Sequence, residues 1–296
     1  MKRAIVLSNM GGARSPQELK LFLKNMFSDK RIVPGWKRYL LAVLLPAFRH
    51  KKVWKNYEKI GGSRIYQLTE KLITQLQSQV KEEVIMSMRY TRPYLKEVSK
   101  GYDELIILPM YPHYSSSTTG SIKDEIAQMD FKGKVRIVPE FYKEEEFNLL
   151  IAKSIIKQVD NPPEVNLIFS AHGLPVYITQ KGDPYIRQIY EHVELLKNLL
   201  PSFKSISVGF QSRVGPVEWQ KPYLEEVLEQ FKGEKVLIYP ISFLIDNSET
   251  DFELKIEYAE MARKIGIKTY KVIDCLNDTP EFALFLGSLI KERLKK

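Results

Sequence analysis

Two residues of the sequence, His172 and Glu249, combine side chains and positions that suit acid–base or metal chemistry. The chain has four histidines in 296 residues, and His172 stands where the apolar run "LIFSA" meets a Gly-Leu-Pro turn. Glu249 also follows an apolar run by a few residues. Ligands of open α/β sheets bind beyond the carboxyl ends of strands, so both side chains are expected there. An imidazole with a carboxylate suits a divalent metal or proton abstraction. A hydrogen-bonded structural histidine and a surface glutamate at a helix start are the alternative.

Two further stretches carry residues that could bind a ligand. "MRYTRP" (88–93) places Arg89 and Tyr90 at a predicted strand end, where Arg89 could bind a substrate carboxylate or form a surface ion pair. "FQSRVGPVEWQKPY" (210–223) breaks at Gly-Pro directly after a predicted strand. Its Trp219 could stack on a flat apolar ligand, or it could be a core residue beside a turn.

Eight short apolar runs, separated by amphipathic stretches, predict the elements that position these residues. The runs are rich in Val and Ile and mostly do not alternate with polar residues, which is typical of strands buried on both faces of a parallel sheet. "SPQE" (15–18) gives one intervening helix an N-cap Ser, a first-position Pro and an early Glu. Alternating strands and helices predict an α/β fold. The predicted strands are 4–9, 84–89, 104–110, 135–140, 165–171, 205–211, 235–242 and 268–273.

The sequence also contains an internal repeat. "IVLSNMGG" (5–12) and "LIFSAHGL" (167–174) are both an apolar run followed by Ser, two residues and Gly. Aligning them places Met10 on His172. We therefore expect two similar halves, each with its own open parallel sheet.

The predicted boundary between the halves lies near "DNPPE" (160–164), where two prolines interrupt a helical pattern. This gives an N-terminal half at 1–160 and a C-terminal half at 161–296. The last helix of the chain is expected to pack back on the first half.

Composition narrows the class of protein. With 44% hydrophobic residues the chain can form a buried core, and its single cysteine, Cys275, excludes a disulfide framework and a four-cysteine zinc or iron–sulfur site. We expect a cytoplasmic protein, because the N-terminus lacks a signal-peptide pattern and no apolar run approaches the length of a spanning helix. The net charge of +9 suits an anionic small molecule or lipid, or simply a solvated surface. No nucleic-acid motif stands out, so no nucleic-acid partner is expected.

The chain resembles the ferrochelatase family, enzymes that insert ferrous iron into a porphyrin. Nine stretches in the family's order carry the resemblance and span nearly the whole sequence. They are "LSNMGG", "YEKIGGSR", "MRYTRPY", "LPMYPHYSSSTTGS", "SAHGLP", "KGDPY", "QSRVGPVEWQKP", "PISFLIDNSETDFELKIEY" and "NDTPEF".

The resemblance implies two Rossmann-like domains with a porphyrin cleft between them, as in type II chelatases. His172 matches the histidine that accepts pyrrole protons or holds the metal, and Glu249 matches the glutamate that works with it. The segment 30–54 matches a lip that closes over the porphyrin and contacts the inner face of a membrane peripherally. No cofactor is implied beyond the substrate Fe(II), and no iron–sulfur cluster. The residues that match the family's pocket lining are Met10, Arg89, Tyr90, Tyr185, Trp219 and Phe243.

The sequence departs from the family pattern at Asn247, where the family has a histidine two residues before Glu249. We expect the Asn247 amide to hold Glu249 or a water by hydrogen bonds. The porphyrin, protoporphyrin IX or coproporphyrin III, is left open. Two rival interpretations are a type II chelatase for another metal and tetrapyrrole, and a porphyrin or haem carrier without enzymatic activity. Retention of His172 and Glu249 favours catalysis over a carrier.

Overall fold

The computed structural model describes residues 1–295, apart from the side chains of Lys37 and Phe48. It contains two compact units. Unit 1 comprises Met1–Glu140 with Asn277–Lys296, and unit 2 comprises Phe141–Leu276. Each unit holds one four-stranded sheet in which every strand pairing is parallel, so the predicted α/β class with parallel sheets is confirmed.

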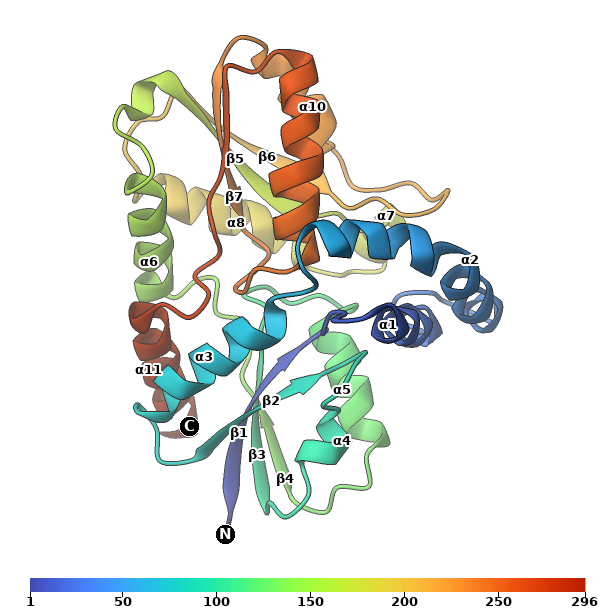
Figure 1. Ribbon diagram of the computed structural model, residues 1–296. Helices are drawn as coiled ribbons and strands as arrows, with labels where there is room; N and C mark the ends of the chain where they lie inside the picture. The colour runs from blue at the N-terminus through green and yellow to red at the C-terminus, as the bar shows by residue number, and fades with distance from the viewer. Residues whose placement is uncertain (296) are drawn as a thin grey trace. The chain divides into compact units, whose positions relative to one another are not determined.

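The sheet of unit 1 has the strand order β2-β1-β3-β4 and helices on both faces (Figure 1). On one face Leu95 and Ile122 pack against Val6 and Ile107 of the central strands. Central strands covered on both sides must be apolar throughout, which explains their unalternating sequence. The strands are β1 (Arg3–Asn9), β2 (Glu83–Met88), β3 (Glu104–Pro109) and β4 (Lys134–Ile137). The helices are α1 (Pro16–Ser28), α2 (Lys37–Lys59), α3 (Ile65–Gln77), α4 (Leu95–Val98), α5 (Thr119–Gln128) and α11 (Pro280–Lys295).

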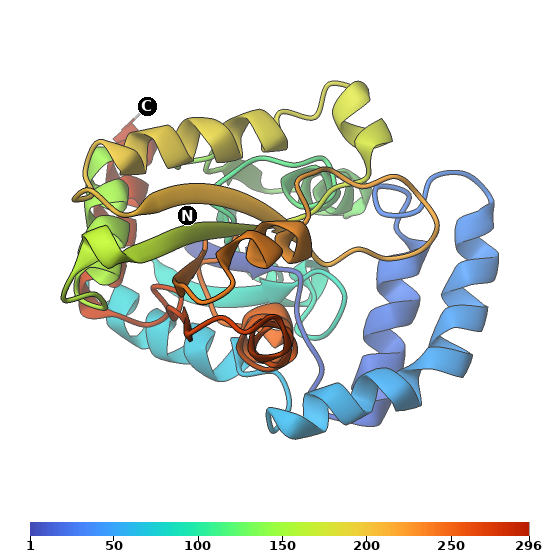
Figure 2. The ribbon, with the colours of Figure 1, turned by 90° about the horizontal axis from the view of Figure 1, so that it is seen from above.

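The predicted start of α1 is confirmed, because the Ser15 hydroxyl accepts a hydrogen bond from the Glu18 N–H at 3.2 Å and Pro16 is the first helical residue. α2 holds most of the predicted lip. It contains Pro46, which lacks the N–H that an α-helix needs at that position, and Figure 2 shows the helix bent along its length.

Unit 2 repeats this plan with the strand order β6-β5-β7-β8. Ile168 and Ile238 of the central strands pack against Leu224 and Leu254, which lie on the helices α9 (Leu224–Leu228) and η3 (Glu249–Glu257). The strands are β5 (Val165–His172), β6 (Ser205–Gln211), β7 (Lys235–Pro240) and β8 (Thr269–Val272). The helices are α6 (Glu145–Ile156), α7 (Val176–Gln180), α8 (Tyr185–Lys197), α9 (Leu224–Leu228), the π-helix η3 (Glu249–Glu257) and α10 (Tyr258–Ile265), with short 3₁₀ turns η1 (Pro162–Glu164) and η2 (Glu229–Phe231).

The division between the units differs from the predicted one at 160. The first unit ends at Glu140, because α6 packs on α8 within unit 2, where the Phe147 ring stacks on His192 with 5.7 Å between ring centroids. The terminal helix α11 belongs to unit 1, where it packs against α3. The prolines at 162–163 that indicated a linker instead form the 3₁₀ turn η1, which leads into β5.

Corresponding strands of the two units end in corresponding ways. β1 and β5 are the second strands of their sheets, and Met10 directly follows β1 while His172 is the last residue of β5. β3 ends at Pro109 and β7 at Pro240. The internal repeat therefore describes two copies of one sheet topology that present different side chains where their central strands end.

Candidate active site

His172 and Glu249 form a hydrogen-bonded pair at the carboxyl end of β5. The Nδ1 atom of His172 lies 2.7 Å from Oε2 of Glu249. Because a carboxylate only accepts hydrogen bonds, Nδ1 carries the proton of this bond, and Nε2 is the nitrogen that is unprotonated when the ring is neutral. The His172 side chain is 37% exposed, whereas that of Glu249 is 19% exposed. The pair therefore leaves a basic nitrogen available on a side chain that is held in a fixed orientation.

The backbone of His172 is fixed by a hydroxyl pair. Its N–H donates to Ser242 Oγ at 3.1 Å, and that hydroxyl lies 2.6 Å from the Tyr185 hydroxyl. Burial raises the pKa of Tyr185, so this phenol stays protonated. Phe243, half-buried, is the next residue along the loop after β7. Tyr185, which was predicted to line the pocket, thus also helps to hold the backbone of His172 through Ser242.

Glu249 is the first residue of the π-helix η3, and Asn247 fixes the entry to that helix. The Asn247 Oδ1 accepts the Glu249 N–H at 2.9 Å, and the Thr250 hydroxyl bonds to the Asn247 backbone. Asn247 is buried. The Asn247 amide therefore holds the backbone of Glu249, which is one of the two arrangements expected from the sequence; the other was a bound water. π-helical turns are rare and are frequent at functional sites.

Two residues not found by sequence reasoning, Ser212 and Glu253, complete the cluster. The Ser212 hydroxyl lies 2.9 Å from Glu249 Oε2 and also bonds to Glu253 Oε2, and the Ser212 N–H donates to Glu253 Oε1 at 2.8 Å. Ser212 has a φ of 68°, a left-handed conformation that is uncommon for a non-glycine residue and often marks a functional site. Only the spacing of Glu253, one helical turn after Glu249, could have indicated it.

The protonation of this cluster reflects burial opposed by charge. Burial tends to lower the pKa of His172, but the charge and hydrogen bond of Glu249 outweigh it, so the net pKa is raised. Burial likewise tends to raise the pKa of Glu249, and its bonds to His172 and Ser212 outweigh it and lower the net pKa. Burial, followed by the Glu249 charge, raises the pKa of Glu253 to about 7. Two nearby carboxyls thus favour different protonation states near neutral pH.

Trp219 lies beside the segment that follows His172. Pro175 and Trp219 pair as an isolated antiparallel bridge, and the Gln220 N–H donates to Leu174 O at 2.9 Å. A Cβ placed on Gly173 would lie 2.9 Å from the Gln211 carbonyl oxygen and 3.4 Å from Cε3 of Trp219. Gly173 is therefore required by the approach of this backbone and ring within the protein.

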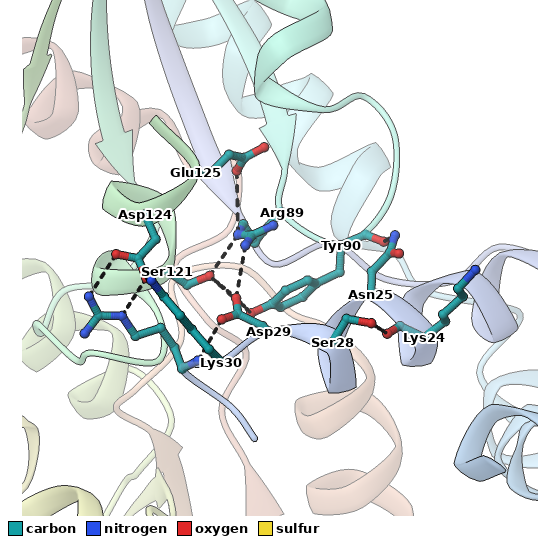
Figure 3. A network of polar contacts seen from close by, with 11 residues as sticks. Lys24, Asn25, Ser28, Asp29, Lys30, Arg89, Tyr90, Ser121, Asp124 and Glu125 are labelled. Atoms are coloured by element: carbon teal, nitrogen blue, oxygen red, sulfur yellow. Dashed lines mark hydrogen bonds and ion pairs between the residues drawn. The ribbon is translucent and has the colours of Figure 1, made fainter. Parts of the chain in front are cut away.

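The other three predicted lining residues lie in unit 1. Met10 is half-buried after β1, and its carbonyl accepts the Tyr90 N–H at 3.0 Å. Tyr90 is only 2% exposed, and its hydroxyl donates to Asp29 at 3.0 Å. Arg89 binds the same carboxylate at 3.1 Å, as Figure 3 shows. The structure thus places Arg89 and Tyr90 in one polar network within unit 1.

A substrate metal would meet few ligands that are already assembled. Within the described residues, no group of three or more His, Cys, Asp or Glu side chains is arranged to hold a metal ion. The His172–Glu249 pair offers one imidazole nitrogen and a carboxylate, which suit Fe(II) without a thiolate.

Solved structures of two other proteins share this fold. SirB from Bacillus subtilis with Fe³⁺ matches with a TM-score of 0.59 and 14% identity, covering 100% of this chain and 95% of that chain. CbiX, described as the terminal enzyme of sirohaem biosynthesis in denitrifying bacteria, matches with a TM-score of 0.55 and 13% identity, covering 99% of both chains. At these identities the likeness shows the fold alone.

Sequence comparison shows the family. The Ferrochelatase family model matches residues 2–294. Ferrochelatases of a Nitratiruptor species and of Campylobacter concisus are each 42% identical, covering 95% and 97% of this chain and 96% of each relative. That of Helicobacter pylori is 38% identical over 98% of this chain and 93% of the relative. The chain belongs to the ferrochelatase family, lyases that insert ferrous iron into a porphyrin in haem biosynthesis.

Proposed function

We propose that His172 is the general base of iron insertion and that Glu249 orients it and takes part in removing the proton. The observation that carries the proposal is the Nδ1–Glu249 hydrogen bond of 2.7 Å, which leaves Nε2 of His172 as the ring nitrogen that can accept a proton, on a partly exposed side chain. An imidazole has an unperturbed pKa of about 6.5, close to operating pH, which is the range that favours a general base.

The reaction needs a base because a free porphyrin carries two inner N–H protons that the metal must displace. In a planar ring the nitrogen lone pairs point inward, and the metal cannot reach them while the protons remain. The site therefore has to bend the macrocycle so that the lone pairs become accessible. It also has to supply a group on one face of the ring that accepts the protons. Nε2 of His172 supplies an acceptor, and the Glu249 carboxylate stabilises the imidazolium that forms.

The imidazolium can then pass the proton on Nδ1 to Glu249, and Glu249 can pass a proton through the Ser212 hydroxyl to Glu253. The Ser212 hydroxyl has one hydrogen but two carboxylate neighbours, Glu249 and Glu253. The contacts are satisfied when Glu253 is protonated and donates to Ser212 Oγ, while Ser212 donates to Glu249. A pKa of about 7 for Glu253 fits this arrangement, because the group gains and loses its proton near neutral pH.

The residues predicted to contact the porphyrin fall into two groups that differ in their surroundings. Met10, Trp219 and Phe243 are half-buried side chains next to strand ends, and Tyr185 supports Ser242 beside His172. Arg89 and Tyr90 already bind the Asp29 carboxylate. We keep the first four residues as porphyrin-site residues. That the reaction needs no iron–sulfur cluster, and that the chain has no nucleic-acid partner, stay predictions.

We further propose that the lip contacts an anionic membrane surface. None of the described helices is long and apolar enough to cross a bilayer. The exposed apolar residues of this segment recur at helical spacing, and exposed lysines 51, 52 and 55 follow on α2. An apolar stripe beside basic residues is typical of an interfacial helix. The stripe consists of Trp36, Tyr39, Leu40, Val43 and Leu44, which are 71%, 64%, 52%, 62% and 41% exposed.

The catalytic proposal is tested by anaerobic turnover of Fe(II) with protoporphyrin IX and with coproporphyrin III. Metalloporphyrin formed catalytically supports it, and the ratio of kcat/KM for the two porphyrins identifies the substrate. A protein that binds porphyrin but forms no metalloporphyrin would be a carrier. A preference for Co(II) or Ni(II) and another tetrapyrrole would make it a different chelatase.

The membrane proposal is tested by sedimentation with vesicles. We expect reversible, salt-sensitive binding to anionic vesicles that weakens in a Leu40→Ser/Val43→Ser variant. Leu149→Ser, which removes an exposed apolar side chain from α6, is the matched control. Equal binding of the wild type to neutral vesicles at any salt concentration would contradict the electrostatic part.

A further inference from the structure

One buried carboxylate, Asp29, collects hydrogen bonds from three other segments of unit 1. It follows directly after α1, and its side chain is 3% exposed. Its Oδ2 accepts from Arg89 Nη2 at 3.1 Å, from the Tyr90 hydroxyl at 3.0 Å and from the Ser121 hydroxyl (Figure 3). Its Oδ1 accepts the Arg31 N–H at 2.8 Å. The carboxylate therefore joins the end of α1, the end of β2 and the first turn of α5.

Arg89 contacts three other residues of the same network. Its Nε donates to Ser121 Oγ at 2.8 Å and lies 3.7 Å from Glu125 Oε2. The Asp29 carboxylate thus already forms an ion pair with the guanidinium, whose side chain is 22% exposed, and Glu125 is a second acidic neighbour. Arg89 lines two cavities. One of about 410 Å³ is formed with residues of α1, α4 and α5 and with Asp29 and Tyr94, and one of about 930 Å³ is formed with residues between Lys96 and Lys134. Nothing in this setting calls for a substrate carboxylate to neutralise Arg89.

The network is linked to the predicted porphyrin site through backbone hydrogen bonds. The Arg89 N–H donates to Asn9 O at 2.8 Å, and the Tyr90 N–H donates to Met10 O at 3.0 Å. The Tyr90 ring packs edge-on against Phe22 of α1, with 6.0 Å between centroids. Holding the side chains of Arg89 and Tyr90 therefore also holds the backbone of Met10 at the end of β1.

We propose that Asp29 is a positioning residue for the porphyrin site, and that Arg89 acts within this network rather than as the residue that binds a substrate propionate. The inference rests on the proposed function, since it concerns how Met10 and the start of the lip are held for porphyrin. Losing one partner of a buried ion pair leaves the other charge uncompensated, whereas replacing both is much less costly. The two residues should therefore behave as a unit.

The experiment compares binding of protoporphyrin IX and of its dimethyl ester, measured by porphyrin fluorescence. The variants are Asp29→Asn, Arg89→Met and the double variant. Asp130→Asn, the same change at an acid that is 86% exposed, is the matched control. We expect each single variant to weaken both ligands by a similar factor of about tenfold, because the lost contact positions the site and touches no propionate. The double variant should bind no more weakly than the worse single variant.

Ser121→Ala provides a milder second variant, since it removes one donor to Asp29 and keeps both charges. It should weaken both porphyrins in parallel by a smaller factor. Weakening of the free acid alone by Arg89→Met, with Asp29→Asn binding like the wild type, would make Arg89 a propionate ligand and overturn the inference. Wild-type-like binding by both Asp29→Asn and Ser121→Ala would overturn it too. A wild type that binds no porphyrin would instead refute the proposed function itself.

Discussion

Each unit contains one buried cluster of charged side chains. The two clusters differ in the basic side chain that lies beside their carboxylates. In unit 1 the carboxylates of Asp29 and Glu125 lie beside Arg89. In unit 2 Glu249 binds His172, and Glu253 joins them through Ser212. A guanidinium keeps its proton at any physiological pH, whereas an imidazole exchanges its proton near neutral pH. The arrangement in the first unit therefore suits a structural role, and the arrangement in the second suits proton transfer.

The comparison is close because each cluster contains one carboxyl with a similarly shifted pKa. Burial raises the pKa of Glu125 to about 7, and burial together with the Glu249 charge raises that of Glu253 to about 7. A shifted pKa alone thus does not identify a catalytic group. The two carboxyls differ in their neighbours. Glu253 lies on a hydrogen-bonded path to the His172 imidazole, which can accept a proton. Glu125 lies beside the Arg89 guanidinium, which cannot.

The largest effect is expected for His172→Ala. Loss of the general base should lower kcat by about 10³-fold, while porphyrin binding stays within about tenfold, or ~1.4 kcal/mol. Anaerobic metalloporphyrin formation measures the first, and porphyrin fluorescence measures the second. Added imidazole should restore part of the rate by occupying the vacated space. Turnover close to that of the wild type would remove His172 from the mechanism and reduce the unit 2 cluster to a structural one.

Glu249→Gln should lower kcat by about 10²-fold, because the amide keeps the size of the side chain but cannot stabilise an imidazolium. Loss of the Glu249 charge should also lower the pKa of His172, since Glu249 is the main group that raises this pKa. Steady-state kinetics as a function of pH measure both effects. Glu260→Gln, at an exposed glutamate of α10, is the control. An equal loss in the control would attribute the effect to general destabilisation.

Glu253→Gln and Glu125→Gln form a matched pair. Each wild-type carboxyl has a raised folded pKa, so the folded state binds the proton more tightly between about pH 4.5 and 7, and this stabilisation is lost as the pH rises through 7. Thermal unfolding should therefore depend less on pH in both variants. Only Glu253→Gln should move the acid limb of kcat/KM, toward lower pH, because the Glu253 charge helps to raise the pKa of His172. A similar movement in Glu125→Gln would erase the distinction between the clusters.

The smallest effect is expected for Asn247→His. The Asn247 side chain accepts the Glu249 N–H and cannot itself take a proton near neutral pH. If His172, Glu249 and Glu253 suffice, restoring the family's histidine should change kcat by less than about tenfold, or ~1.4 kcal/mol. Steady-state kinetics measure this change. A gain of several hundredfold would show that the proton route runs through position 247.

The strands were the most predictable part of the molecule. Each of the eight predicted runs overlaps a strand of the structure, and the boundaries of 205–211 agree with those of β6. Strands buried on both faces need continuous apolar sequence, so they are visible without tertiary information. The boundary between the units was not visible in the same way. The prolines at 162–163 indicated a linker, but the packing of α6 on α8 placed that helix in unit 2.

The sequence by itself determined the family and the parallel α/β class, because strand ends and motif order are local properties of the chain. From spacing alone it left open whether His172 and Glu249 form a pair, and the structure shows their hydrogen bond. Only the tertiary structure decided which other residues contact the charged side chains of the two clusters. Ser212 reaches Glu249 and Glu253 from the end of a different strand, and Asp29 reaches Arg89 and Tyr90 from the end of α1. Such contacts join residues tens of positions apart. Each depends on how the helices and strand ends pack, and a one-dimensional pattern does not record that packing.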